Sequence, residues 1–365
     1  MKMGIIGDAH LGCADYTERR RADFAQAFIN AVESCLAEGV ESLCLLGDVF
    51  DSALMRRNVE AFASTLKEVG PLFDRLRTER IPIFAIAGNH EFGRGREAAE
   101  LSILEALGFL RVLRGEQTVI GGCAVVGFPW HSQDEIAALH PRVRGIPRGS
   151  ISARRILLLH NFIKGSAFIP SHVGEVDSGI AEGFDRVFVG HHHDAEELGA
   201  FVMPGATEVQ NLAEADSHKS VVIYDTSVDA VIFRKLPKTR DVIVLTYDVG
   251  EFTDRERLLS AISNSLAGRQ LGNAFVCIRV KGQATQWSVS KAEVVALLRN
   301  FDIFDRYVEV RTTESVRTAV EAVAGASIDA RLQQAFGAQA KKAHTYIDDC
   351  TNDGFPASII DRILR

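Results

Sequence analysis

The 365-residue sequence lacks most of the features that mark membrane proteins, secreted proteins and zinc ribbons. It has no apolar run near the ~18 residues that a membrane-spanning helix needs. Its six cysteines are scattered without a C-x-x-C pair, which argues against a zinc knuckle and against a disulfide framework. The opening residues, MKMGIIGDAH, show no signal-peptide core or cleavage site. We therefore expect a reduced, cytoplasmic protein without membrane contact.

Positive charge is not in excess either, since the formal net charge is −7 at pH 7. This balance argues against a protein that coats nucleic acid uniformly, but it permits a local basic surface. One stretch, HPRVRGIPRGSISARR (140–155), holds five arginines and no acidic residue. Its proline and glycine content predicts a loop, and on charge alone a solvated loop is a simpler explanation than a binding surface.

Short apolar runs rich in β-branched residues alternate with amphipathic helical stretches over residues 1–236, which is the pattern of an α/β fold. Seven runs are strand candidates: KMGIIG, SLCLLG, IPIFAIAG, TVIGGCAVVGF, RILLLH, RVFVG and SVVIYD. Residues 237–240 (PKTR) predict a linker. A second unit, 241–320, then follows the order strand, helix, strand, helix, strand, and the residues after it look helical. Both helices of this unit begin with a capping-box pattern, Thr253 with Glu256 and Ser290 with Glu293.

Five of the apolar runs end in side chains that can bind a metal ion. These side chains are Asp8 and His10, Asp48, Asn89 and His90, His160, and His191 and His193. In open α/β sheets, ligands bind at the carboxyl ends of the strands, so five strands that end this way form a constellation. Residues two apart in an extended chain point to the same side, which lets the D-x-H and H-x-H pairs converge while His192 faces away. Glycines directly before Asp8, Asp48, Asn89 and His191 allow the backbone to turn sharply there.

The candidate ligands combine oxygen and imidazole without thiolate, a set that suits manganese, iron or zinc better than calcium. Seven side chains are too many for one ion but fit two ions that share a bridging carboxylate. Such pairs of ions clamp the attacking and leaving oxygens of a displacement at phosphorus. Taken singly, each Asp or His could be a cap or turn residue at a strand end. Taken together and in this order, they favour a two-metal site.

In these blocks the sequence resembles the calcineurin-like metallophosphoesterases, because GDAH, GDVFD, GNHE, LLLHN and GHHH stand where that superfamily has its motifs. Within it, the chain is most similar to the double-strand-break repair nucleases, the bacterial SbcD subunits and their Mre-eleven relatives. Four features carry this closer likeness: DAHLG, the pattern of Arg20 and Asp23 before Ala27-Phe28, GDVFDS, and MPGATEVQNLAEADSHKSVVIYD (203–225) with its downstream Glu and Lys. The likeness covers residues 1–236, whereas residues 241–320 match only in their pattern.

The resemblance implies a calcineurin-like fold of two packed mixed β-sheets flanked by helices over residues 1–236. It further implies a smaller α+β capping domain that binds DNA over 241–320. The helical segment 327–365 would dock on an ABC-type ATPase, the SbcC or Rad-fifty partner. Family members of this type also pair as homodimers through helices that correspond here to 57–76 and 97–107, although core packing explains the apolar spacing of both equally well.

The resemblance also implies an activity, that of a metal-dependent DNA nuclease with double-strand exonuclease and single-strand endonuclease action in DNA repair. Two divalent ions, with Mn²⁺ expected, would activate the attacking water. One ion would be bound by Asp8, His10, Asp48 and His193, and the other by Asp48, Asn89, His160 and His191. His90 would contact the scissile phosphate and stabilise or protonate the leaving oxygen. The candidate contacts to the DNA backbone are Arg142, Arg144 and Arg148.

Two positions depart from the family pattern. Glu91 follows GNH where these nucleases usually have Asp, and Asp51 stands where Mre-eleven proteins can carry a second histidine at the phosphate. From Asp51 we infer that His90 acts without that helper. Two other functions stay open: a metallophosphoesterase that acts on small phosphodiesters or phosphomonoesters, and a metal-free scaffold on the same fold. Relative activity on duplex DNA and on a small diester separates the first from a nuclease, and metal content decides the second.

Overall fold

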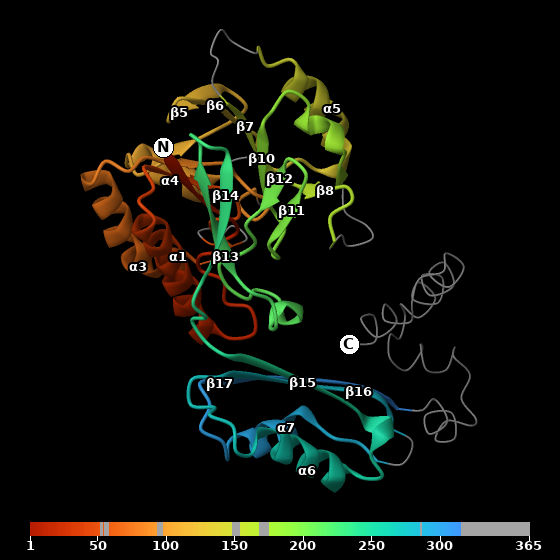
Figure 1. The fold of residues 1–365 in the computed structure, drawn as a ribbon. Helices are drawn as coiled ribbons and strands as arrows, with labels where there is room; N and C mark the ends of the chain where they lie inside the picture. Colours follow the sequence, from red (N-terminus) through yellow and green to blue (C-terminus); the bar gives the residue numbers. More distant parts are fainter. Residues whose placement is uncertain are drawn as a thin grey trace, which may run out of the picture.

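The computed structural model describes residues 1–51, 54, 58–92, 98–147, 154–167, 175–284 and 287–314. Within them, two six-stranded sheets lie against each other, and a three-stranded sheet lies beyond one end of this pair (Figure 1). Buried side chains of both large sheets, such as Ile5 and Phe188, fill the space between the two. The predicted pair of packed mixed sheets is therefore confirmed.

The first large sheet consists, in spatial order, of β14 (Ala230–Lys235), β13 (Ser220–Asp225), β1 (Lys2–Ile6), β2 (Ser42–Leu45), β3 (Ile83–Ala85) and β4 (Arg111–Val112). The strands β1 to β4 are parallel, whereas β13 pairs antiparallel with β1 and β14. Three helices cover its outer face: α1 (Arg21–Ala37), α3 (Val59–Thr78) and α4 (Ala99–Ala106). Their apolar residues, such as Phe28 and Phe73, are buried in one cluster with the sheet.

The second large sheet consists, in spatial order, of β11 (Glu196–Leu198), β12 (Phe201–Met203), β10 (Arg186–Gly190), β7 (Arg155–His160), β6 (Cys123–Gly127) and β5 (Gln117–Ile120). The strands β12, β10, β7 and β6 are parallel, so their carboxyl ends share one edge. The helix α5 (Gln133–Arg144) covers the outer face, and a short ribbon of β8 (Phe162–Ile163) and β9 (Glu175–Val176) follows β7. Each of the seven predicted runs contains strand residues, but TVIGGCAVVGF forms two antiparallel strands, β5 and β6, rather than one. The strands β4, β8, β9, β11, β12 and β14 have no counterpart among the predicted runs.

The third sheet is made of β15 (Val242–Asp248), β16 (Phe275–Ala284) and β17 (Asp305–Glu314), which are all parallel. The helices α6 (Arg255–Leu266) and α7 (Lys291–Leu298) connect these strands and cover one face with a hydrophobic cluster of their own. Ser290 and Glu293 form the predicted capping box of α7, whereas Asp254 rather than Thr253 caps α6. We call residues 241–314 the three-stranded unit.

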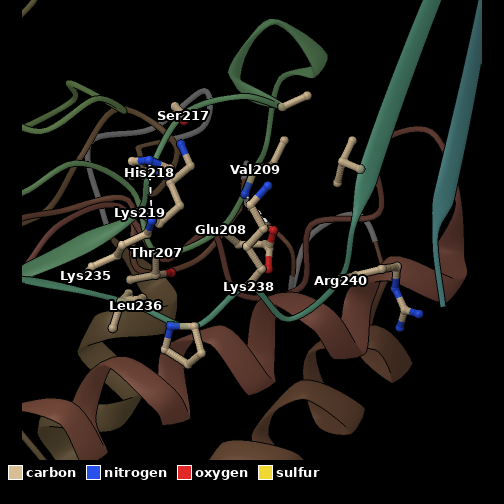
Figure 2. Close-up of a pocket in the computed structure, with 13 residues that line it drawn as sticks. Thr207, Glu208, Val209, Ser217, His218, Lys219, Lys235, Leu236, Lys238 and Arg240 are labelled. Atoms are coloured by element: carbon tan, nitrogen blue, oxygen red, sulfur yellow. Dashed lines mark hydrogen bonds between the residues drawn. The ribbon is translucent and has the colours of Figure 1, made fainter. Parts of the chain in front are cut away.

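The other face of the three-stranded unit rests on loops of the large sheets. Phe275 of β16 is buried in one small cluster with Leu212. Beside it, the linker residue Arg240 forms an ion pair with Asp23 of α1 at 2.7 Å, and its guanidinium lies 3.2 Å from the centre of the Phe304 ring. Figure 2 shows the linker at this junction. Apolar and charged contacts therefore hold the three-stranded unit against the loops of the large sheets.

The apolar spacing of α3 and α4 reflects packing within the chain. Phe62, Val69 and Leu104 are buried in the cluster under the first sheet, whereas Leu107, just past α4, is 52% exposed. The homodimer therefore draws little support from these side chains. The predicted helical segment 327–365 lies outside the described residues. Among the described helices, none is long and apolar enough to cross a membrane.

Candidate metal centre

The predicted ligands come together at the carboxyl edge of both large sheets. Asp8 follows β1, Asp48 follows β2, Asn89 follows β3, and His160 and His191 lie at the ends of β7 and β10. Three groups of side chains each place their ligand atoms within 4.8 Å of one another: Asp8, His10 and His193; His10, Asp48 and His90; and Asp48, His160 and His191. Asp48 belongs to two of these groups, as a bridging carboxylate would.

Close approach of the strand ends explains two of the glycines. A Cβ on Gly190 would lie 2.1 Å from the carbonyl oxygen of Leu46, and a Cβ on Gly47 would lie 2.4 Å from Nδ1 of His160. Gly47 also has a φ of 90°, a conformation that favours glycine. The predicted sharp turn is therefore found at Gly47, while Gly190 permits contact between neighbouring loops.

Three of the candidate ligands have positive φ angles themselves: His10 (45°), Asp48 (46°) and His191 (78°). For residues with a Cβ, such conformations cost ~1–3 kcal/mol each and persist where the surroundings impose them. Their concentration at one edge of the sheets indicates that this edge is a functional site.

The atoms around His160 include more acceptors than donors. Nδ1 of His160 lies 2.6 Å from the carbonyl oxygen of Leu46, so Nδ1 donates and Nε2 of the neutral ring carries a lone pair. That Nε2 lies 3.2 Å from Oδ2 of Asp48 and 3.2 Å from Oδ1 of Asn89. Burial opposes a charged imidazole, yet the charge of Asp48 outweighs it and raises the pKa of His160 to about 9. With the pKa raised in this way, a proton on Nε2 can bridge to these oxygens. A divalent metal would replace that proton, because imidazole, carboxylate and amide together suit such an ion.

A second set of potential metal-ligand atoms faces the same space. It includes the Nε2 atoms of His10 and His193, which lie 3.2 Å apart. Nδ1 of His193 donates to Oε1 of Glu214 at 2.8 Å, so Nε2 of His193 also presents a lone pair. Burial alone would raise the pKa of Glu214, but its hydrogen bond with His193 and the charge of Lys219 lower it to about 2. The centre thus offers two adjacent sets of potential metal-ligand atoms. The roles of Glu214 and Lys219 were not evident from the sequence, where the block 203–225 was their only signal.

His90 differs from the candidate ligands in its partner rather than in its exposure. Its side chain is 23% exposed, close to the 21% of His193, whereas Asp8, Asp48 and His160 are almost fully buried. Nδ1 of His90 lies 2.8 Å from Oδ1 of Asp51. Burial lowers the pKa of His90, but the hydrogen bond with Asp51 and the charge of Asp48 outweigh burial and raise it. The inference that His90 acts without a second histidine as helper stays a prediction, and the carboxylate of Asp51 contacts the ring in that position.

Glu91 ties the loops of the centre to one another. Its buried carboxylate accepts hydrogen bonds from the backbone N–H groups of Asp48 (3.0 Å), Phe50 (2.9 Å) and Gly88 (2.7 Å). Burial and the nearby charge of Asp48 raise the pKa of Glu91 to about 8. One side chain thus joins the loops after β2 and β3, which carry Asp48 and Asn89. The departure at position 91 keeps an acidic group in a structural role.

Comparison with known proteins agrees with this geometry. A sequence model of the family described as calcineurin-like phosphoesterase matches residues 1–233, well over half of the chain. The chain belongs to this family.

Curated relatives of this phosphoesterase include several named DNA double-strand break repair protein Mre11. The chain is 26% identical to the one from Methanosarcina mazei over 76% of its own length and 45% of the relative. It is 26% identical to that of Halobacterium salinarum, over 79% of the chain and 72% of the relative. For Haloferax volcanii the identity is 28%, over 80% of the chain and 64% of the relative. The phosphoesterase thus spans about half the length of the Methanosarcina relatives that it matches.

The arginine stretch of the phosphoesterase is less loop-like than predicted. Its first residues form the last turn of α5, which continues through Pro141. The helix ends at Gly145, whose N–H donates to the carbonyl oxygen of Pro141 at 2.9 Å. Within this turn, Nη1 of Arg142 lies 3.3 Å from Nε2 of His131, so the guanidinium is held near the end of β6.

Arg144 has different neighbours from Arg142. Two residues after Arg144, the carbonyl oxygen of Ile146 accepts a hydrogen bond from Nη2 of Arg155 at 3.4 Å. Arg155 begins β7, so the backbone just after Arg144 lies near the amino end of that strand. Arg144 itself forms a solvent-exposed ion pair with Glu182 at 3.6 Å. Arg148 lies outside the described residues.

A pocket of about 440 Å³ opens beside the centre of the phosphoesterase. Asp48, His90, His191 and His193 contribute to its wall. Phe162 adds an apolar face, with its ring centre 4.2 Å from that of His191. A substrate in this pocket would therefore meet His90 and the candidate ligands together.

Proposed function

We propose that the chain is a two-metal DNA nuclease with double-strand exonuclease and single-strand endonuclease action in DNA repair. The observation that carries this proposal is the convergence of acceptor atoms around Asp48, with His90 beside them on the pocket wall. The relatives named for double-strand break repair support DNA as the substrate. Manganese is the expected metal, because imidazole and carboxylate ligands without thiolate suit it.

Seven side chains would hold the two ions, in two sets that share Asp48. One set is Asp8, His10, Asp48 and His193, and the other is Asp48, Asn89, His160 and His191. When bound, such ions lower the pKa of a water molecule and neutralise charge on the phosphate. His90, with its ring held by Asp51 and its backbone N–H donating to Asp48 at 2.8 Å, would give a hydrogen bond or a proton to the leaving oxygen.

The choice of substrate is tested with one enzyme preparation in Mn²⁺. Linear duplex DNA, single-stranded DNA and a small phosphodiester are compared as substrates. The proposal predicts that both forms of DNA are cleaved and that the duplex is hydrolysed faster than the small diester. A strong preference for the small diester would overturn the assignment to DNA and favour a small-molecule phosphoesterase.

Replacing Asp51 by Asn should change the pH dependence of turnover. Asn keeps the shape of the side chain but removes the charge that helps to raise the pKa of His90. A general acid must be protonated, so the rate falls as pH rises through its pKa, and a lower pKa moves this alkaline limb to lower pH. We expect the alkaline limb of the kcat profile of Asp51→Asn to lie below that of the wild type. An unmoved limb at normal metal content would show that Asp51 does not act through His90.

The arginines of the 140–155 stretch are proposed contacts to the DNA backbone. Replacing Arg142, Arg144 and Arg148 by Ala should weaken binding to all sequences alike and flatten the salt dependence by ~0.9 per lost contact. Because His131 holds its guanidinium in place, Arg142→Ala alone should account for the largest share. Binding to labelled duplex DNA over a series of salt concentrations measures the slope. A slope equal to that of the wild type would show that these arginines form a solvated surface and do not contact the DNA backbone.

The three-stranded unit is proposed as the DNA-binding capping domain, and residues 327–365 as the segment that docks on an SbcC or Rad-fifty type ATPase. A homodimer is also proposed. Deletion of 327–365 should abolish co-purification with the ATPase and leave Mn²⁺-dependent cleavage intact.

We propose the cytoplasm as the location, since the five described cysteines are buried and free.

A further inference from the structure

Glu214 lies between a candidate metal ligand and a lysine. Its Oε1 accepts a hydrogen bond from Nδ1 of His193 at 2.8 Å, and its Oε2 accepts one from Nζ of Lys219 at 2.6 Å. Lys219 also donates to the backbone carbonyl oxygen of His193 at 3.1 Å. The side chains of Glu214 and Lys219 are only 10% and 8% exposed, so water competes little for these bonds. The ring and the backbone of His193 are therefore both held on the side away from Nε2.

The other set of potential metal-ligand atoms, around His160, is held by a different kind of partner. His160 has a backbone carbonyl, that of Leu46, as the partner of its Nδ1. No side-chain substitution removes that partner. His193, in contrast, depends on a side chain for its orientation, so the two donor sets can be disturbed separately.

Glu214 is itself fixed by the turn that carries it. It ends the 3-10 helix η3 (Leu212–Glu214), and its Oε1 also accepts from the backbone N–H of Asn211 at 3.2 Å in a capping box. Leu212 and Ala215, on either side of it, are buried in one cluster with Phe275 of β16. The three-stranded unit thus braces the turn from which Glu214 reaches His193.

We propose that Glu214 is the positioning residue for His193 and sets the affinity of one of the two metal sites without touching the substrate. This inference rests on the proposed two-metal function. The carboxylate keeps the proton on Nδ1, which leaves Nε2 as a lone-pair ligand, and it prevents rotation of the ring. Loss of such a partner costs ~10–100-fold in metal affinity. The set around His160 keeps its own partner and should keep its affinity.

The test is Mn²⁺ binding to the metal-free full chain by isothermal titration, together with the electron paramagnetic resonance spectrum of the loaded protein. The wild type should bind two ions and give the spectrum of an exchange-coupled pair. Glu214→Ala should bind one ion as tightly as the wild type and the other ~10–100-fold more weakly. At equal Mn²⁺, its spectrum should therefore show more of the signal of isolated ions.

Glu214→Gln separates orientation of His193 from the ion pair with Lys219. Gln keeps an oxygen that accepts from Nδ1 of His193 but loses the negative charge that pairs with Lys219. The positioning role predicts that Gln restores most of the affinity that Ala loses. If the ion pair alone mattered, Gln would bind Mn²⁺ as weakly as Ala, and the proposal would be overturned.

Glu293→Ala is the matched control. Glu293 closes the capping box of α7 with Ser290 and pairs with Arg255 at 2.8 Å, so it repeats the local contacts of Glu214 without a histidine. We expect it to leave both Mn²⁺ affinities unchanged. Equal affinities in Glu214→Ala and a wild type that binds two ions and cleaves DNA would overturn the positioning role alone. A wild type that binds no Mn²⁺ would instead overturn the proposed function.

Discussion

His90→Ala is expected to keep both metal ions and to lose turnover by ~10²–10⁴-fold, the contribution of a general acid or base. The His90 side chain lies on the pocket wall, is 23% exposed and is hydrogen-bonded to Asp51. The group of potential ligand atoms around His160 does not include the His90 ring, although the group of His10 and Asp48 does. Because Asp51 orients its ring and the ring lines the pocket, we assign His90 to the phosphate rather than to an ion. The kcat on linear duplex DNA and the metal content are measured on the same preparation.

His191→Ala is the comparison for this experiment. His191 belongs to the group that contains Asp48 and His160, so its loss should remove metal as well as activity. The two variants then differ in metal content although both are inactive. An inactive His90→Ala that has also lost its metal would show that His90 is a ligand, and the catalytic assignment would fail.

Glu91→Ala should strongly lower the free energy of unfolding. The change leaves the backbone N–H groups of Asp48, Phe50 and Gly88 without their acceptor, and each unsatisfied buried donor costs ~1–3 kcal/mol. We expect the free energy of unfolding of the metal-free protein to fall by about 3 kcal/mol or more. Mn²⁺ binding should also weaken, because the loops that carry Asp48 and Asn89 lose their common tie. Urea unfolding and Mn²⁺ titration measure the two effects.

Glu105→Ala is the control for Glu91→Ala. Glu105 accepts from one backbone N–H, that of Val112 at 2.7 Å, and pairs with Arg114, but it has no contact with the centre. Its loss should cost less stability and leave Mn²⁺ affinity unchanged. A Glu91→Ala protein as stable as the wild type, with normal metal binding, would show that water replaces this carboxylate.

The candidate ligands could be predicted from the sequence because a strand end is a local signal. Each apolar run is followed directly by its candidate ligand, so the pattern that predicts the strand also predicts which edge the ligand reaches. The two-residue spacing also predicted that His192 turns away, and its Nε2 accepts from the backbone N–H of Ile163 at 3.3 Å. The strands β4, β8, β9, β11 and β12 were missed because two or three residues are too few to show an alternating pattern, whereas β14 was missed despite its six residues.

Contacts between distant parts of the chain could not be predicted in the same way. Asp51 and His90 are 39 positions apart, and nothing local indicates that their side chains meet. The link from Glu214 to His193 likewise depends on how η3 is placed by the three-stranded unit. The loop prediction around Arg142 failed for a local reason, because proline usually ends a helix and α5 continues past it.

The most direct test of the two-metal account is a titration of metal-free protein with Mn²⁺ that follows bound metal and digestion of linear duplex DNA in the same samples. The account predicts that hydrolysis appears as the second ion binds, at two ions per chain, and that a chelator abolishes it. Digestion that persists in chelator, or two bound ions without any phosphodiester hydrolysis, would contradict the account.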